Sequence, residues 1–227
     1  MTTIYTFNNK VLKNSANDKW LIKKAQPILP ANTIRVRTSD GNVPIKGITT
    51  LYETATLVPG TNDEYDVYRS GTSLSQLLYG SSNVVEVIGA NTTNVTNMNS
   101  MFYGCSSLTS VPLFDTSNVT GMESMFMYCT SLRTVPLFDT SSVTIMRYMF
   151  MNCSSLTSVP LFDTSSVSNM AKTFYGCVNV ESGALALYQQ ASTQTNPPTN
   201  NYQTFTNCGS NTVTGVAELA QIPSSWK

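Results

Sequence analysis

The chain contains no histidine and little charge, and both absences narrow its possible chemistry. Charged residues make up only 11% of the 227 residues, and 13 basic side chains balance 13 acidic ones. Because histidine is the commonest general base and metal ligand at neutral pH, its absence disfavours acid–base catalysis and metal chemistry. A net charge of zero offers no attraction to nucleic acid or to an anionic membrane. We therefore expect neither an enzyme nor a nucleic-acid-binding protein.

Long hydrophobic runs are also missing. No stretch approaches the roughly 20 consecutive apolar residues that cross a bilayer, so we expect no membrane insertion. The first residues, MTTIYTFNNKVLKNSANDKW, lack the apolar run of a secretory signal. We expect a protein that stays where it is made or leaves as part of a larger particle.

Repetition is what the sequence has in abundance. The motif VPLFDTS occurs three times, at Val111–Ser117, Val135–Ser141 and Val159–Ser165, and each copy starts 24 residues after the last. The segment SLSQLLYGSSNVVEV fits the same 24-residue period and is a degenerate opening repeat. A fixed period of this size is typical of stacked repeats, and the sequence predicts a leucine-rich-repeat-like α/β solenoid of about five rungs over residues 71–180. The columns that recur include Val95, Val119, Val143 and Val167; Met98, Met122, Met146 and Met170; Phe102, Phe126, Phe150 and Phe174; and Cys105, Cys129, Cys153 and Cys177.

Each period combines two patterns. In TNMNSMFYGC, residues 96–105, the apolar side chains recur at i, i+3, i+4 and i+7, which predicts a short helix with Thr96 as its N-cap. In LTSVPL, the apolar positions Leu108, Val111 and Leu113 predict a strand. Pro112 removes a ladder donor from that strand, so we expect it to be very short or irregular.

The shared columns, VTxMxxMFxxCxSLxxVPLFDTSxVT, resemble the BspA-type leucine-rich repeat of bacterial surface proteins and mycoplasma lipoprotein-like repeats. The closing segment, VESGALALYQQAS and CGSNTVTGVAELAQIPSSW, is similar to the endings of such repeats in gut-bacterial and phage-encoded chains. The resemblance implies adhesion and surface binding without catalysis, and we expect no cofactor.

The two ends of the chain depart from the repeat. In residues 1–70, IRVRT-SDGN-VPIKGITTLY predicts two strands joined by a hairpin at Asp40-Gly41, and KWLIKKAQPIL suggests a further strand. This β-rich N-terminal module would cap the solenoid or dock it to a larger assembly. In residues 181–227, SGALALYQQAS predicts a helix, and TFTNC restores Phe205 and Cys208 of the repeat, as expected of an interrupted terminal repeat and C-terminal cap.

The cysteines and aspartates could form special sites. Equivalent cysteines of adjacent rungs would lie about 4.8 Å apart with parallel side chains, whereas a disulfide needs Cβ atoms about 3.8 Å apart that face each other. We therefore expect free, buried thiols. The row of Asp115, Asp139 and Asp163 either caps its own turns or binds Ca²⁺. One carboxylate per rung favours capping, and we expect no metal site.

Positions that vary between repeats are candidates for recognition, because scaffold columns need to stay constant. Tyrosine, methionine and arginine are also common in contact surfaces. For the column of Tyr103, Met127, Met151 and Tyr175, half-buried packing against the next rung is the alternative. The candidate contact surface comprises Tyr103, Met127, Tyr128, Arg147, Tyr148, Met151 and Tyr175.

The sequence as a whole predicts a non-enzymatic repeat module that mediates attachment or protein–protein binding, with a protein or a surface glycan receptor as its partner. A surface-exported protein needs an export signal, whereas a virion protein is released by lysis. We therefore expect a phage virion component of the tail or capsid decoration, with residues 1–70 contacting other virion proteins. A bacterial cell-surface adhesin and an intracellular binding scaffold are the alternatives.

Overall fold

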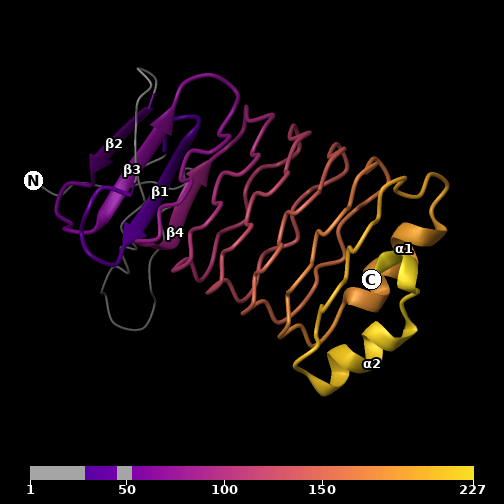
Figure 1. Cartoon of the computed structure of the whole chain (residues 1–227). Helices are drawn as coiled ribbons and strands as arrows, with labels where there is room; N and C mark the ends of the chain where they lie inside the picture. Colours follow the sequence, from indigo (N-terminus) through magenta and orange to yellow (C-terminus); the bar gives the residue numbers. More distant parts are fainter. Residues whose placement is uncertain (1–28, 45–52) are drawn as a thin grey trace, which may run out of the picture.

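The computed structural model describes residues 29–44 and 53–227, in which an antiparallel sheet adjoins a long stack of chain turns (Figure 1). Two short helices lie at the opposite end of the stack from the sheet. The sheet has the strand order β2-β3-β1-β4. Its strands are β1 (Thr33–Thr38), β2 (Glu53–Leu57), β3 (Glu64–Arg69) and β4 (Val84–Asn91). The helices are α1 (Ala184–Thr193), α2 (Val213–Gln221) and a 3-10 turn, η1 (Ser224–Trp226).

The hairpin predicted at Asp40-Gly41 is wrong. Both edges of β1 are paired, with β3 and β4, and the hairpin in the described sheet joins β2 to β3. Most of the second predicted strand, residues 43–52, lies outside the described residues. The Asp40-Gly41 turn does form, with Gly41 at φ 67°. Its Asp40 carboxylate accepts hydrogen bonds from the Asn42 backbone N–H and the Asn83 side chain, both at 3.0 Å. The strand expected in KWLIKKAQPIL lies outside the described residues except for its last residue.

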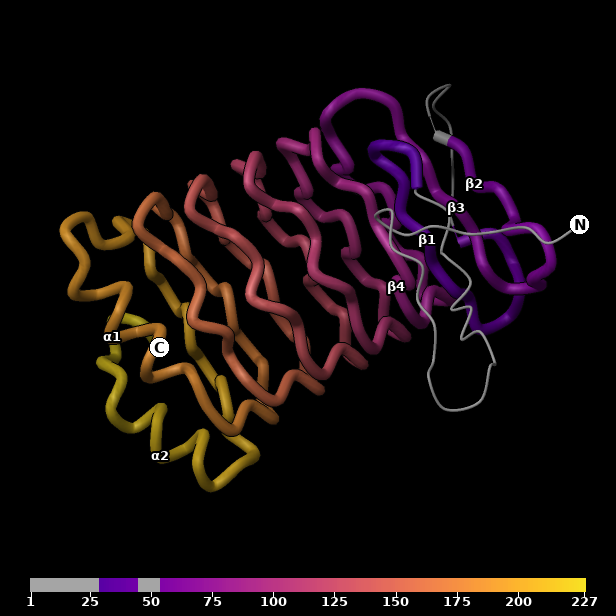
Figure 2. The backbone as a smooth tube through the Cα atoms, turned by 180° about the vertical axis from the view of Figure 1, so that it is seen from behind, coloured from indigo at the N-terminus to yellow at the C-terminus, as the bar shows by residue number. Residues whose placement is uncertain are grey.

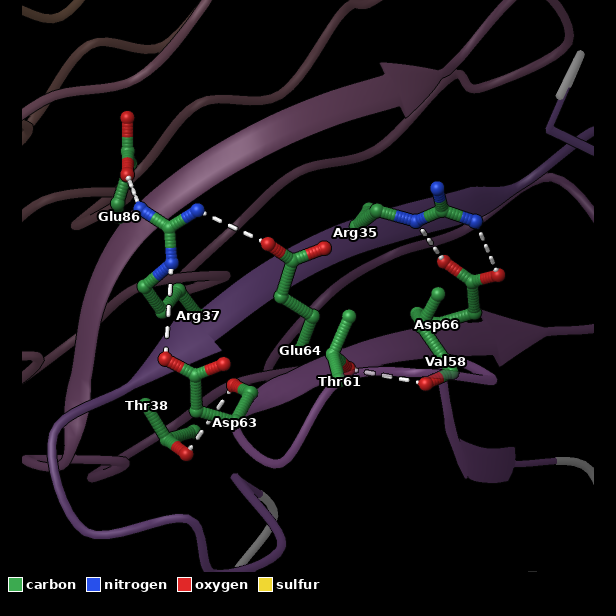
Figure 3. Close-up of polar contacts among 9 residues, drawn as sticks. All are labelled: Arg35, Arg37, Thr38, Val58, Thr61, Asp63, Glu64, Asp66 and Glu86. Carbon is green, nitrogen blue, oxygen red and sulfur yellow. Dashed lines mark hydrogen bonds and ion pairs between the residues drawn. The ribbon is translucent and has the colours of Figure 1, made fainter. Parts of the chain in front are cut away.

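Ion pairs on one face of the sheet join β1 to both of its neighbours, β3 and β4 (Figure 3). Arg35 donates two hydrogen bonds of 2.7 Å to the carboxylate of Asp66 on β3. Arg37 reaches Glu64 on β3 at 2.9 Å and Glu86 on β4 at 2.6 Å. Because side chains alternate along a strand, the residues between these arginines face the other way, towards the core.

The sheet continues into the stack through β4. Ile34 and Val36 of β1 are fully buried and belong to the same hydrophobic core as the repeats. Glu86 of β4 forms a parallel bridge with Ser110 of the next turn of chain. The sheet therefore covers the first end of the stack.

From residue 72 the chain winds in successive turns that lie side by side, and we call each 24-residue turn a rung (Figure 2). Parallel bridges join equivalent positions of consecutive rungs. Alternate backbone N–H groups of one rung also donate to carbonyl groups of the next; those of Met98, Ser100, Phe102 and Gly104 form bonds of 2.8 to 3.0 Å. The bridged positions are Ser73, Asn97, Gly121, Ile145, Asn169 and Asn200.

The helix predicted within each rung is wrong, because residues 98–105 form a run of turns. An α-helix needs every N–H for the carbonyl four residues back, but here every second N–H is bound to the next rung. The backbone has positive φ at Ser100 (55°) and Gly104 (70°). Thr96, expected as an N-cap, donates its hydroxyl to the Thr72 carbonyl at 3.3 Å instead. The predicted burial is confirmed: Met98, Met101, Phe102 and Cys105 are each 0% exposed.

The strand predicted in LTSVPL is reduced to isolated bridges such as those at Ser110 and Ser158. Leu113, an apolar position of that predicted strand, is 65% exposed. The next residue, Phe114, takes the buried place with 3% exposure. The chain does not extend regularly past Pro112, so the two-residue alternation fails there.

Two columns of phenylalanine rings stack through the core. The first column, predicted from the sequence, has ring centroids 5.3 to 5.9 Å apart. The second, which was not predicted, has centroid distances of 5.5 and 6.4 Å. The first column contains Phe102, Phe126, Phe150, Phe174 and Phe205, and the second contains Phe114, Phe138 and Phe162.

The far end of the stack is covered by the two helices and the C-terminal residues. The helix predicted at SGALALYQQAS is confirmed as α1, whose Gln190 side chain donates to the Phe162 carbonyl at 2.9 Å. Helix α2 was not predicted; its N-cap Thr212 accepts the Gly215 N–H at 3.0 Å. Trp226 closes the first phenylalanine column, with its ring 6.2 Å from that of Phe205. Within the described part of the chain, no helix is both long and apolar enough to cross a membrane.

Candidate functional site

Two columns of every rung have positive φ, and the most variable side chains occupy them. The repeated turns require this left-handed backbone, which glycine and asparagine adopt most easily. Tyr128, Tyr148 and Lys172 occupy these columns although an ordinary side chain costs about 1 kcal/mol or more there. The first column is Gln76, Ser100, Ser124, Tyr148, Lys172 and Gln203, and the second is Gly80, Gly104, Tyr128, Asn152, Gly176 and Asn207.

These columns and their neighbours carry three clusters of aromatic and cationic side chains, which together we call the aromatic face. In the turn run, two pairs of partly exposed positions, such as 99–100 and 103–104, flank a buried pair, so the residues of the face project from one side of the stack. The face comprises Tyr79, Tyr103, Tyr128, Arg147, Tyr148, Lys172, Tyr175 and Tyr202.

Three tyrosines form the first part of the aromatic face. The rings of Tyr79 and Tyr103 are parallel within 4° and their centroids lie 4.4 Å apart. Tyr128 meets Tyr103 edge-on with a centroid distance of 5.6 Å. Desolvation and the neighbouring Tyr79 raise the pKa of Tyr103 above its ordinary value. Stacked and edge-to-face arrangements are the ones that aromatic pairs favour, so the three rings support one another.

An arginine stacked on a tyrosine forms the middle part. The guanidinium carbon of Arg147 lies 4.5 Å from the ring centroid of Tyr148. The Arg147 Nε atom is 3.0 Å from an oxygen of Glu123 on the preceding rung. The arginine is thus held by one carboxylate and one ring while its side chain remains 43% exposed.

A lysine between two tyrosines forms the last part. The Nζ atom of Lys172 lies 5.6 Å from the ring centroid of Tyr175 and 5.8 Å from that of Tyr202. Tyr202 is the most open ring of the face, at 61% exposure.

The structure brings the predicted contact residues to one side of the stack. Tyr103 contacts Tyr128, Arg147 contacts Tyr148, and Tyr175 contacts a lysine that the prediction did not include. Met127 and Met151 are half-buried in the column between Tyr103 and Tyr175.

Three members of the face, Tyr79, Lys172 and Tyr202, were not predicted from the sequence. Tyr79 occupies the position of Tyr103 in the opening repeat, so the 24-residue period could have placed it on this face. Tyr202 follows its equivalent, Ala171, by 31 residues because the last rung contains an insertion. In the sequence, only the Phe-x-x-Cys spacing of Phe205 and Cys208, which restores the repeat after the insertion, could have indicated the position of Tyr202.

The cysteines are free and buried, which confirms the prediction of unpaired thiols. The Cys129 S–H donates to the Phe102 carbonyl at 3.0 Å, and Cys105, Cys153 and Cys177 form equivalent bonds. Burial raises the pKa of the Cys105 thiol to about 12. The pKa values of Cys129, Cys153, Cys177 and Cys208 are raised by burial as well. Thiols in this state are poor nucleophiles because the thiolate is the reactive form.

The aspartate row caps its own turns, as the capping interpretation predicted. Asp139 accepts the Ser141 hydroxyl at 2.6 Å and the Ser141 N–H at 3.0 Å, and these bonds lower the pKa of its carboxyl. Asp163 accepts the Ser165 N–H at 2.8 Å, and hydrogen bonding from Ser165 lowers its pKa too. Among the described residues, no three His, Cys, Asp or Glu side chains are grouped so that they could hold a metal ion.

A second exposed surface lies along the VPLFDTS segments. Leu113, Leu137 and Leu161 are 65%, 60% and 53% exposed, respectively, and recur at the rung spacing. Unlike the aromatic face, this column is identical in all three copies.

The stacked rungs, the repeated columns and the variable outer face define a repeat protein. The chain belongs to the family described as Mycoplasma protein of unknown function, DUF285, whose pattern matches residues 72–206, more than half of the chain. The match covers the rungs from the first to the interrupted last one. No curated protein and no solved structure matches the chain.

Proposed function

We propose that this protein is a non-enzymatic attachment module whose aromatic face binds a protein partner. The observation that carries the proposal is the placement of Tyr128 and Tyr148 at positive-φ positions. The left-handed backbone there favours glycine or asparagine. Gly104 and Asn152 occupy the same column as Tyr128, so the stack accepts either residue type at that position. Residues in strained backbone conformations cluster at functional sites, so the large side chains at these two positions support a role in contact.

The composition of the face supports binding to a protein. Tyrosine and arginine are enriched among residues that dominate the energy of protein interfaces. A tyrosine offers a large contact area at a low cost in conformational entropy. The contacts of Tyr103 with Tyr79 and Tyr128 reduce that cost further because the rings are already ordered. A surface glycan is the second candidate, favoured by the open ring of Tyr202.

The chemistry of the reactive side chains supports a role without catalysis. The thiols are buried with raised pKa values, so they lack the thiolate character of a nucleophile. The carboxylates of Asp139 and Asp163 are held by the following serines. The sequence offers no histidine to serve as a general base.

We further propose that the rungs form a BspA-type leucine-rich-repeat solenoid. The regular 24-residue columns, the ladder of bonds between rungs and the membership in a repeat family support this assignment. The strand position of a leucine-rich repeat would correspond to the bridges at Ser110 and Ser158.

For the setting we propose a phage virion, with a bacterial cell surface and the cell interior as alternatives. The similarity of the closing segment to phage-encoded repeat chains supports the virion, and its similarity to gut-bacterial chains supports the cell-surface alternative. Mass spectrometry of purified, nuclease-treated particles from the source should then detect the chain in stoichiometric amounts. Its absence from particles, with recovery in the cell envelope or the cytosol, would reject the virion.

Photo-crosslinking tests the binding face and does not require the partner to be identified first. The photoreactive residue p-benzoylphenylalanine would replace Tyr202 or Tyr79 on the aromatic face, and Leu137 or Val213 elsewhere. All four positions are exposed, with Val213 at 90%. In its native source, the protein should give one discrete adduct from Tyr202 and Tyr79 and only background from Val213. Adducts from Leu137 alone would indicate that the column of Leu113, Leu137 and Leu161 binds the partner and would reject the aromatic face.

A further inference from the structure

We infer that Lys172 is the point where the aromatic face receives a carboxylate group of an acidic protein partner. This inference rests on the attachment function proposed above and specifies its partner.

The backbone fixes where the Lys172 side chain starts. Lys172 has φ 55°, and its N–H donates to the Tyr202 carbonyl at 2.9 Å. The Nζ atom lies within 6 Å of the ring centroids of both Tyr175 and Tyr202. At this distance a cation is attracted to the ring faces, so the ammonium group stays on the aromatic face instead of ranging freely.

The charge of this lysine is left uncompensated. Within residues 29–44 and 53–227, the ion pairs involve other groups, and no carboxylate lies within ion-pair distance of the Lys172 ammonium. The neighbouring cation, Arg147, is already paired with Glu123 at 3.0 Å. The aromatic face therefore presents one net positive charge, contributed by Lys172.

A partner that covers this charge has to replace the water around it. Two aromatic rings do not supply an anion, and burying an unpaired ammonium group is costly. A partner carboxylate placed beside Lys172 offsets that cost, and the hydroxyls of Tyr175 and Tyr202 can donate to its oxygens. Complementary charge would also speed association and orient the partner.

The arrangement of the rings favours a protein over an acidic sugar. Tyr79 and Tyr103 stack on each other at 4.4 Å, so each covers a face of the other ring. At most one face of each ring is then left for a sugar ring to pack against. Stacked tyrosines beside the stacked Arg147 suit the mixed polar and apolar surface of a protein.

An NMR titration of the ¹⁵N-labelled full chain tests the inference. The probe is an end-blocked octapeptide of alternating glutamate and glycine, and a glutamine–glycine octapeptide is its control. The glutamate peptide should shift the amide signals of Lys172, Tyr175 and Tyr202, with weaker binding as the ionic strength rises from about 0.05 M to about 0.5 M. Lys172→Gln should weaken this binding at least about threefold. Lys172→Arg should retain it, and Arg133→Gln, a change at an exposed cation elsewhere, should have no effect.

Three results would overturn the inference. They are equal shifts from the glutamine peptide, unchanged binding in Lys172→Gln, and a response only to a trimer of galacturonic acid, which would indicate an acidic glycan. If any of these occurs while Tyr202 still crosslinks in the native source, the attachment function stands and only the role of Lys172 is rejected. If the chain with p-benzoylphenylalanine at position 202 and no other change gives no adduct, the attachment function itself is rejected.

Discussion

At the scale of single residues, two columns of each rung have a left-handed backbone, and the residues in them differ from rung to rung. The turn run places positive φ at two columns whatever residue is present, as the series from Gly104 through Tyr128 to Asn152 demonstrates. Glycine and asparagine adopt positive φ easily, so these residues fit the backbone conformation. Where tyrosine stands, the conformation costs free energy, and we propose that the side chain is used in binding.

This conflict predicts that asparagine can replace two of the tyrosines without loss of stability. Tyr128→Asn and Tyr148→Asn each relieve left-handed strain but remove a ring contact, so we expect unfolding free energies within about 1 kcal/mol of the parent. Denaturant unfolding measures this, and Tyr128→Val is the matched control because a β-branched residue is strained at positive φ. A loss of more than about 2 kcal/mol in the asparagine variants would assign these tyrosines to folding.

The thiols provide a second prediction at this scale. Because burial raises the pKa of Cys105 to about 12 and raises the pKa values of the other cysteines, the native protein should react with iodoacetamide very slowly at pH 8. In denaturant without reductant, all five should be alkylated. Recovery of a Cys105–Cys129 disulfide would contradict the parallel ladder.

At the scale of elements, the burial of the first half of each rung was predictable from the sequence, but its secondary structure was not. The spacing of Met98, Met101, Phe102 and Cys105 fits a helix face, and all four are buried. The same spacing also fits successive turns, because each turn advances the chain by a similar number of residues. Only the ladder between rungs decides between the two, and a single repeat gives no sign of it.

Other elements show the same limit. The SDGN turn was recognisable, but the partners of β1 are β3 and β4, which lie far along the chain and which no local signal identifies. In the VPLFDTS segment, Leu113 and Phe114 are both apolar, and the local path at Pro112 decides which one is buried. For the candidate site, the positions that vary between repeats predicted most of the aromatic face. The contacts of Lys172 depend on the three-dimensional arrangement of two rungs and could not be derived from the sequence.

The phenylalanine column yields a prediction about packing. Phe126 is fully buried between Phe102 and Phe150, so Phe126→Ala should destabilise the protein by about 3–5 kcal/mol through the cavity it leaves. Leu137→Ala is the control, since a side chain that is 60% exposed should change stability by less than about 1 kcal/mol. Chemical denaturation of both variants tests the core, and equal effects would contradict the assignment of the column.

The turn after β1 gives a prediction about pH. Hydrogen bonds from Asn42 and Asn83 lower the pKa of Asp40 to about 2. A carboxyl whose pKa is lower in the folded state stabilises the fold fully above its unfolded pKa, about 3.9, and loses this contribution as pH falls towards 2. The lowered pKa values of Asp139 and Asp163 act with the same sign.

The melting temperature should therefore fall between about pH 4 and about pH 2, and Asp40→Asn should lessen the fall. Thermal melts at constant ionic strength measure both curves. Parallel curves for the parent and Asp40→Asn would contradict a role of this carboxylate in acid stability.

At the scale of the whole molecule, the stack is closed at both ends and variable along one side. The sheet covers the first rung through β4, and α1, with Trp226, covers the last. A stack closed in this way does not need a neighbouring copy to complete its core. Its long sides remain available, and the aromatic face is the side whose residues change from rung to rung.

One measurement tests this account most directly: the yield of the Tyr202 photo-crosslinked adduct in the Tyr128→Asn/Tyr148→Asn double variant. These two tyrosines lie on other rungs, so their replacement leaves the crosslinking position unchanged. The account predicts a variant that melts like the parent but has lost most of the adduct. An undiminished adduct from the folded double variant would contradict the claim that the aromatic face binds the partner.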